Sequence, residues 1–171
     1  VTILSRDGRQ IDRKDTRFGF REWDWSGTRL TLNGVRWTLM TDHGHYAGEP
    51  TPEEGLAKMR ANGAVQQRWT ITGSGRKWCG LGMYDFLTFA DENGIVARVG
   101  SPFNGMFANY RLVWREERDG KQIEVANEPL FRNATAQNVG MVKGLRNHPS
   151  IFGWSLENEV FFIAAQGRDS E

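Results

Sequence analysis

The sequence predicts an α/β fold in which parallel strands alternate with helices, and three observations predict it. Apolar strands and amphipathic helices follow one another in the order β-α-β-α-β-α-β after a β-rich beginning. The helix-to-strand connections are short and are expected at Gly63, at Gly94 and over residues 147–150. The strand-to-helix connections are long and are expected over residues 42–50, 70–82 and 100–127. This order favours neighbouring parallel strands joined by right-handed crossovers.

The difference in loop length favours a barrel. In a barrel of alternating strands and helices, the loops after the strands form the functional face, and the opposite loops only close the fold. An open doubly wound sheet has the same asymmetry, so loop length alone leaves both folds open. A dinucleotide-binding or phosphate-binding loop would favour the open sheet. Gly73-Ser74-Gly75 lacks a third glycine and a following helix start, and no other strand is followed by such a loop.

The first 37 residues have the pattern of a β-rich region. Short alternating stretches are separated by the turn dipeptides Asp7-Gly8, Ser26-Gly27 and Asn33-Gly34. Residues 35–41 are then expected to form the first strand of the alternating part.

The first helix has clear signals at both ends. Thr51 and Glu54 are spaced as a capping box around a proline at the first helical position. Leu56 and Met59 are expected to face inward, and Asn62-Gly63 ends the helix. A strand over residues 64–69 follows, with a weaker signal because two glutamines interrupt its apolar pattern.

The remaining elements follow in the same manner. A second helix is expected over residues 84–93, with Met83, Leu87 and Ala90 inward and Gly94 as its cap, and a strand over 95–99. A third helix is expected over residues 128–146, with the apolar stripe Met141, Val142 and Leu145. Pro149 prevents its continuation, and residues 151–156 form the last expected strand.

Composition gives little support for nucleic-acid or membrane partners. Lys and Arg number 22 and Asp and Glu 21, without a block of like charge that would follow a phosphate backbone or an anionic bilayer. The apolar runs are shorter than the roughly 20 residues that cross a bilayer. Cys79 has no cysteine partner within the chain, so it is expected to be a packed thiol. The chain begins at Val1, as an excerpt would; the compartment is undetermined, with secretion or the periplasm favoured.

Residues 146–159 carry the clearest chemical signal. An apolar strand ends in Asn158-Glu159, which a parallel sheet would deliver to its ligand-binding edge. Retaining glycoside hydrolysis needs one carboxyl group that protonates the leaving oxygen and later activates water, and a second that acts as nucleophile. Glu159 can supply the first, because nearby aromatic residues such as Trp154 or Phe161 would desolvate it and raise its pKa.

The pattern N-H-P-S-I-x-x-W-S-L-x-N-E in this segment resembles the acid/base signature of glycoside hydrolase family 2, a family of retaining β-glycosidases with (β/α)8 barrels. Further stretches resemble the family in the same order, so that the similarity covers roughly residues 17–160: Phe18-Gly19-Phe20-Arg21-Glu22, Leu32-Asn33-Gly34, His45, residues 61–68, residues 84–87 and residues 91–96.

The resemblance implies a role for each matching residue. Glu159 matches the general acid/base, and Asn158 matches the amide that binds the sugar 2-hydroxyl. Arg68 matches an arginine that supports the catalytic carboxylates, and His45 matches a residue at the mouth of the barrel. A carbohydrate substrate is implied, with no cofactor and no metal.

The resemblance also implies a domain organisation. Residues 1–30 match the end of an immunoglobulin-like region with its linker, and residues 31–171 match the first half of a TIM barrel, about four strands. The family's nucleophile is a glutamate on the seventh strand, which has no counterpart here, so the isolated chain is expected to be inactive. A half barrel exposes strand edges, and we therefore expect the chain to need its missing half or a second copy.

Several alternatives stay open at this point. Glu157 stands where many family members have Gly, and another family of the same clan would share the Asn-Glu pair. A non-catalytic carbohydrate-binding or structural fragment would also lack the nucleophile. A structural ion pair explains Arg68 as well as a functional role does. Asp42-His43-Gly44-His45 lacks a third metal ligand at sensible spacing, and His148 is expected to be a capping or packing residue.

Overall fold

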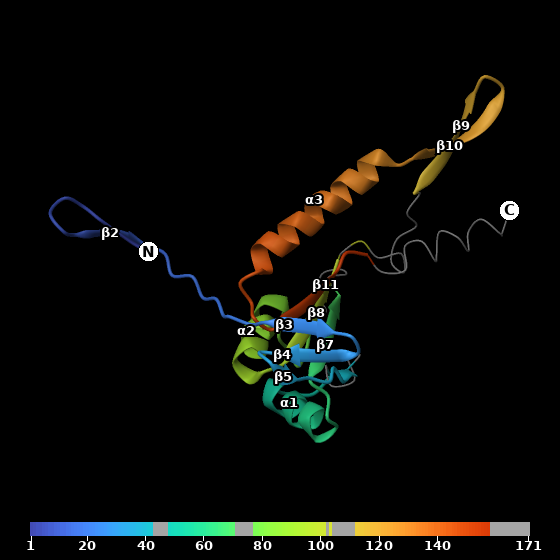
Figure 1. Ribbon diagram of the computed structural model, residues 1–171. Coiled ribbons are helices and arrows are strands. Elements are labelled where there is room, and N and C mark those ends of the chain that lie inside the picture. Colours follow the sequence, from blue (N-terminus) through green and yellow to red (C-terminus); the bar gives the residue numbers. More distant parts are fainter. Residues whose placement is uncertain (43–47, 71–76, 102, 104–111, 158–171) are drawn as a thin grey trace.

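The computed structural model of the protein describes residues 1–42, 48–70, 77–101, 103 and 112–157. Within these residues the chain forms three helices, one parallel sheet and three antiparallel sheets (Figure 1). None of the helices in this part of the chain combines the length and the apolar character that a membrane span requires.

The centre of the fold is a four-stranded parallel sheet. Its strands lie in sequence order. They are β6 (Thr41–Asp42), β7 (Gln66–Thr70), β8 (Val96–Gly100) and β11 (Ile151–Ser155). One helix precedes each of the last three strands, namely α1 (Pro52–Ala61), α2 (Met83–Asn93) and α3 (Glu128–Leu145). The predicted alternation and parallel pairing are confirmed, whereas closure into a barrel stays a prediction.

The signals at the ends of α1 act as the sequence predicts. The Thr51 hydroxyl oxygen accepts a hydrogen bond from the Glu54 backbone N–H at 3.2 Å, which satisfies one of the unpaired donors of the first turn. Leu56 and Met59 are buried on its inner face. The helix ends at Asn62, which is its C-cap.

Helix α2 supplies the largest share of the core. Phe86, Leu87 and Ala90 are fully buried, and the helix ends at Gly94 in the left-handed conformation (φ 69°), as predicted. The indole ring of Trp78, from the segment before α2, packs against the ring of Phe86 with 5.2 Å between centroids. The buried core lies between the sheet, α1, α2 and the last turn of α3, and consists of Leu56, Met59, Trp78, Cys79, Phe86, Leu87, Ala90, Ile95, Ala97, Val99, Leu145 and Ile151.

Helix α3 contacts this core only near its carboxyl end. Leu145 is buried and Met141 packs against the core, but Val142 of the predicted stripe is half-exposed. Figure 1 shows the rest of the helix extending away from the sheet. The Asn127 side chain caps its amino end by accepting a hydrogen bond from the Leu130 N–H at 3.2 Å.

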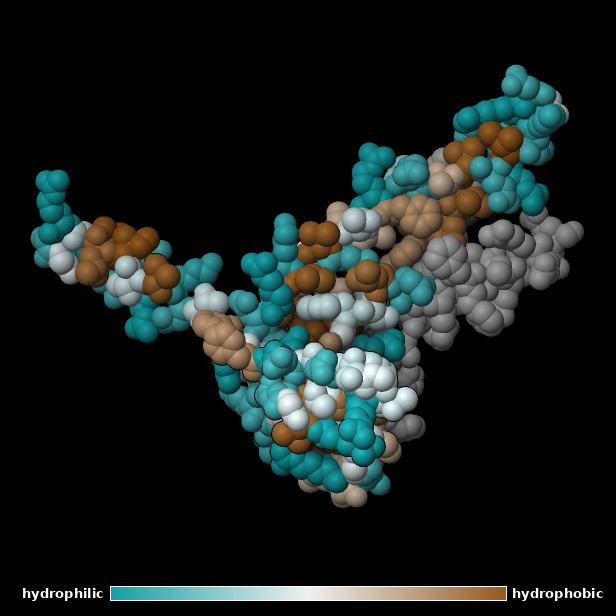
Figure 2. Space-filling model, in the orientation of Figure 1, coloured by the Kyte–Doolittle hydropathy of each residue, from teal (hydrophilic) through white to brown (hydrophobic). Residues whose placement is uncertain are grey.

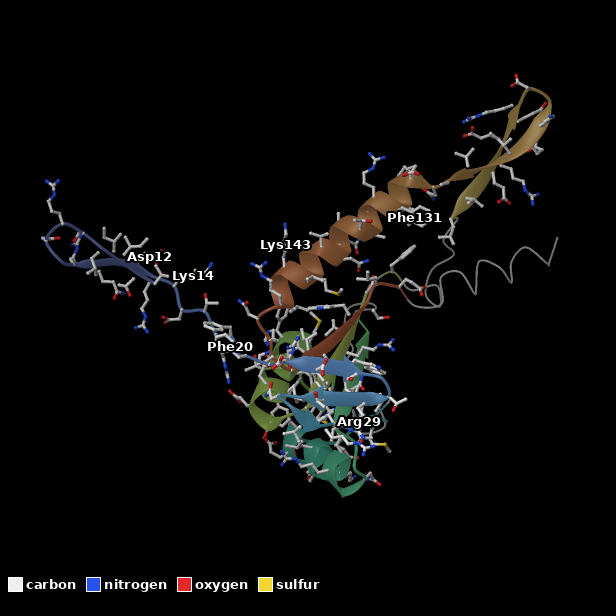
Figure 3. All side chains as sticks on the ribbon, viewed as in Figure 1. Asp12, Lys14, Phe20, Arg29, Phe131 and Lys143 are labelled. Atoms are coloured by element: carbon white, nitrogen blue, oxygen red, sulfur yellow. The ribbon has the colours of Figure 1, made fainter. Side chains whose placement is uncertain are left out.

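The beginning of the chain is β-rich, as predicted. It forms a hairpin of β1 (Thr2–Leu4) and β2 (Gln10–Arg13) and an antiparallel sheet of β3 (Trp23–Ser26), β4 (Arg29–Leu32) and β5 (Val35–Arg36). Figure 1 shows the β1–β2 hairpin projecting from the body, and Figure 2 shows apolar side chains on its surface. Phe20, in the segment that follows the hairpin, is 91% exposed and is labelled in Figure 3.

The prediction of one strand over residues 35–41 is wrong. Val35 and Arg36 pair back with β4, because the Asn33-Gly34 turn reverses the chain immediately before them. The Trp37 N–H continues this pairing by donating to the Leu30 carbonyl oxygen at 2.9 Å. Only Thr41 and Asp42 join the parallel sheet, as β6.

The prediction of a long loop over residues 100–127 is also wrong in part. Strands β9 (Val113–Arg118) and β10 (Lys121–Ala126) form a regular antiparallel hairpin before α3 (Figure 1). Its turn residues Asp119 and Gly120 both have positive φ, 54° and 69°, as the favoured two-residue hairpin turn requires. An Asp-Gly pair between alternating residues is a local signal that would have predicted this hairpin.

The antiparallel sheet of β3, β4 and β5 packs near the amino end of β11. The Trp23 ring lies 4.7 Å from the ring of Phe152, edge to face, and 6.5 Å from that of Trp37. The predicted domain boundary after residue 30 falls within β4, which pairs with β3. This sheet therefore includes residues from both predicted domains. The domain boundary itself stays a prediction.

Strand β11 is irregular at its second residue. Ile151 lies opposite Ala97 of β8, and Gly153 lies opposite Arg98, so Phe152 is an additional residue in the register. A strand with such an insertion bends and twists more strongly than a regular one.

Candidate active site

The candidate site lies at the carboxyl edge of the parallel sheet. β11 is paired with β8 up to its last residue, with Ser155 opposite Gly100. The Ser101 N–H continues the ladder by donating to the Ser155 carbonyl oxygen at 2.7 Å. Asn158 and Glu159 follow three and four residues after Ser155, so β11 directs the chain toward this edge just before the predicted catalytic pair.

The sequence relates each predicted site residue to a strand of the parallel sheet. Arg68 lies in β7, where its backbone pairs with Arg98 of β8. His45 comes three residues after the end of β6. His45, Asn158 and Glu159 lie outside the described residues. All four positions therefore belong to a strand of the parallel sheet or follow the carboxyl end of one.

Three polar contacts hold the described chain immediately before Asn158. The Ser155 hydroxyl donates to the Glu157 carbonyl oxygen at 2.9 Å, and Arg98 Nη2 donates to Ser155 Oγ at 3.4 Å. Asn138 Nδ2, from the middle of α3, donates to the Leu156 carbonyl oxygen at 3.0 Å. Sequence reasoning did not identify Asn138 or Arg98, because neither belongs to a motif.

The strand ends before Glu157, which bears on how its neighbours are directed. Strand alternation would aim residues 157 and 159 to the same side only if β11 continued through them. It ends at Ser155, and the exposed Glu157 lies beyond it. Strand alternation therefore does not determine the directions of Asn158 and Glu159.

A second polar cluster lies at the opposite end of β11. The Asp91 side chain is only 5% exposed; its Oδ2 lies 2.7 Å from His148 Nδ1, and its Oδ1 accepts a hydrogen bond from the Ser150 N–H at 2.9 Å. Arg21 Nη1 donates to the His148 carbonyl oxygen at 2.8 Å, and burial lowers the pKa of Arg21. These contacts agree with the packing role predicted for His148. They lie at the amino end of β11, and the candidate site lies at its carboxyl end.

The described residues offer no cluster of three or more His, Cys, Asp or Glu side chains that would hold a metal ion. Cys79 is buried against α1, and desolvation by burial raises the pKa of its thiol. A thiol with a raised pKa is a poorer nucleophile at neutral pH, because the thiolate is the reactive form.

Comparison of the sequence with known proteins points to one class of enzyme. The chain is 26% identical over 170 residues to a β-galactosidase of Vibrio cholerae, and 27% identical over 170 residues to a β-galactosidase of Alteromonas mediterranea. Both alignments cover 93% of this chain but only 15% and 14% of the relatives, so the chain spans a small part of their length. No protein-family model matches the chain.

Solved structures agree in fold. A β-glucuronidase from Ruminococcus gnavus matches 98% of this chain with a TM-score of 0.58 and 21% identity, over 28% of its own length. A β-D-mannosidase from Dictyoglomus thermophilum matches 88% of this chain with a TM-score of 0.51 and 17% identity, over 18% of its length. The chain is similar to β-glycosidases. Relatives in sequence and neighbours in structure thus support a relationship to glycoside hydrolases.

Proposed function

We propose that this chain is the first half of the (β/α)8 barrel of a longer retaining β-glycosidase, and that it resembles glycoside hydrolase family 2. The observation that carries the proposal is the end of β11. Four parallel strands lie in sequence order, and the last of them leads directly into Asn158-Glu159. In barrel enzymes the residues that follow the strands form the catalytic face.

Glu159 is the general acid/base of the proposed reaction. It first gives its proton to the oxygen that leaves with the aglycone, while a carboxylate from the other half of the barrel attacks the anomeric carbon. It then removes a proton from water, which attacks the glycosyl-enzyme and restores the nucleophile. The products are a sugar of retained configuration and the free aglycone.

The other predicted residues act around this step. Asn158 binds the sugar 2-hydroxyl, whose hydrogen bonds strengthen in the transition state. Arg68 supports the catalytic carboxylates from β7. His45 lies at the mouth of the site, after β6.

The test is made on the longer parent enzyme with aryl β-galactosides, β-glucuronides and β-mannosides. Glu159→Gln and Glu159→Ala are expected to lower kcat on the best phenyl glycoside by about 10²–10⁴-fold, because the leaving oxygen and the attacking water lose their acid and base. Added azide is expected to restore turnover of activated substrates and to give a glycosyl azide, since an anion needs no base to attack the glycosyl-enzyme.

Glu157→Gln provides the matched control, because Glu157 is an exposed carboxylate two residues away in the same segment. Its kcat is expected to stay within about twofold of the parent, because the proposed mechanism gives the exposed Glu157 side chain no part in proton transfer. Full phenyl glycoside activity in both Glu159 variants would remove Glu159 from the mechanism. A parent without any glycosidase activity would favour a non-catalytic carbohydrate-binding protein.

A further inference from the structure

We propose that Asn138 of α3 is a positioning residue for the general acid/base, acting through the backbone of the segment that leads to Glu159. This inference rests on the proposed function and deepens it. It places part of the control of catalysis in a helix whose side chains carry no recognised motif.

The geometry supports a role of this kind. Asn138 Nδ2 donates to the Leu156 carbonyl oxygen at 3.0 Å, across 18 residues of chain. Leu156 is the first residue after β11, so this bond acts where the regular ladder with β8 has ended. Asn138 therefore holds the backbone one residue beyond the ladder with β8, two positions before Asn158 in the sequence.

The bond also joins the middle of α3 to this segment. Asn138 lies between Phe131 and Lys143, which Figure 3 labels along the helix. The buried residue of α3 is Leu145, two turns further on. Within the described part of the chain, the Asn138 side chain links the middle of α3 to the segment after β11 by a hydrogen bond.

Neighbouring bonds restrict the same segment from the sheet side. Ser101 holds the Ser155 carbonyl, and the Ser155 hydroxyl holds the Glu157 carbonyl. Three successive carbonyl groups, of residues 155, 156 and 157, are thus hydrogen-bonded before Asn158. Asn138 supplies the one bond of this set that comes from the helical layer.

The consequence concerns geometry rather than overall stability. A displacement of about 1 Å of a catalytic group can cost about 10²-fold in rate, because reacting atoms must be close and aligned. Loss of Asn138 would free the Leu156 carbonyl group, and we expect it to slow proton donation by Glu159. Substrates with a poor leaving group need that proton, whereas dinitrophenolate leaves without it.

The experiment therefore compares leaving groups in the full-length parent enzyme. Asn138→Ala is expected to lower kcat/KM about tenfold for phenyl β-glycosides and less than about twofold for dinitrophenyl β-glycosides, since only the former need protonation. Asn138→Asp keeps the shape but removes the donor, and should behave like alanine. Asn138→Gln keeps a donor amide and should recover part of the phenyl glycoside activity.

Asn133→Ala is the matched control, because Asn133 is an exposed asparagine on the same helix. It should leave both substrates unchanged. An equal loss on both substrates in Asn138→Ala would indicate a merely structural role and overturn the proposal, as would full activity in Asn138→Asp. If Glu159→Gln is inactive while Asn138→Ala has the same kcat/KM values as Asn133→Ala, only the positioning role of Asn138 is contradicted. If Glu159→Gln keeps full phenyl glycoside activity, both proposals fail.

Discussion

Asp91 shows how one buried side chain can fix the start of a strand. Its two carboxylate oxygens contact His148 and the backbone of Ser150, which lie 57 and 59 residues further along the chain. Ser150 is the residue before β11, so Asp91 joins the end of α2 to the beginning of the strand that leads to the candidate site.

Asp91→Ala is expected to lower the free energy of unfolding by about 1–3 kcal/mol, because the buried Ser150 N–H loses its acceptor. Urea unfolding followed by tryptophan fluorescence measures this change. Asp24→Ala is the control, since Asp24 is exposed on β3, and it should stay within about 0.5 kcal/mol of the parent. Equal midpoints for the two variants would show that Asp91 has no anchoring role.

Residue-level predictability depends on how far apart the partners are in the chain. Thr51 was predicted as a cap because its partner Glu54 is three residues away, and the structure has that bond. Glu159, Asn158, Arg68 and His45 were inferred from motif resemblance, and their roles stay predictions. The bonds of Asp91 and Asn138 join residues 57 and 18 positions apart, and no local pattern of side chains encodes such pairs.

At the scale of elements, a glycine has a different effect on packing in α1 than in α3. Gly55 in α1 lies against Trp78 and Cys79: a Cβ placed there would come 2.5 Å from the Cys79 sulfur and 3.2 Å from the Trp78 ring. Gly140 in α3 has no such neighbour within 4 Å. The first glycine permits close packing, and the second only lowers helix propensity.

Alanine substitutions at these two positions should therefore have opposite effects. Gly55→Ala is expected to destabilise the protein by about 1–3 kcal/mol through overpacking. Gly140→Ala is expected to stabilise it by about 0.5–1 kcal/mol, because alanine loses less backbone entropy in a helix. Thermal unfolding measures both changes, and a gain in melting temperature for Gly55→Ala would contradict the packing explanation.

Elements were predicted best where local signals mark both ends. The limits of α1 and α2 followed from Thr51, Asn62 and Gly94. The prediction of one strand over residues 35–41 was wrong. Residues 35–36 pair with β4 and residues 41–42 pair with β7, so the segment is divided by its pairing partners. The β9–β10 hairpin was missed although Asp119-Gly120 signalled it, since the segment was interpreted by loop length alone.

At the scale of the whole molecule, the parallel sheet is open. Within the described residues no strand pairs with the outer edge of β6 or with that of β11. Apolar side chains are also exposed on the projecting β1–β2 hairpin, among them Ile3 at 52% and Ile11 at 62% (Figure 2). Unpaired strand edges and contiguous apolar surface favour association.

The isolated 171-residue chain is therefore expected to self-associate or aggregate at micromolar concentration, and to bind a hydrophobic dye. Sedimentation velocity over a range of concentrations measures the association. If the proposed half barrel holds, addition of its other half as a separate chain is expected to reduce the association. A monodisperse monomer that unfolds cooperatively by itself would contradict this expectation.

The extra residue at Phe152 decides which way the last strand presents its side chains. In a regular strand, Ile151, Gly153 and Ser155 would point to the same side of the sheet. Because Phe152 is inserted, Trp154 instead joins Ile151 on the side of Ala97 and Val99, toward the helices, where it packs on the core. Ser155 is turned to the other side, where it meets Arg98. A deletion of Phe152 would leave Trp154 opposite Val99 and keep the two sides, whereas regular pairing with Phe152 retained would interchange them and turn the Ser155 hydroxyl toward the core.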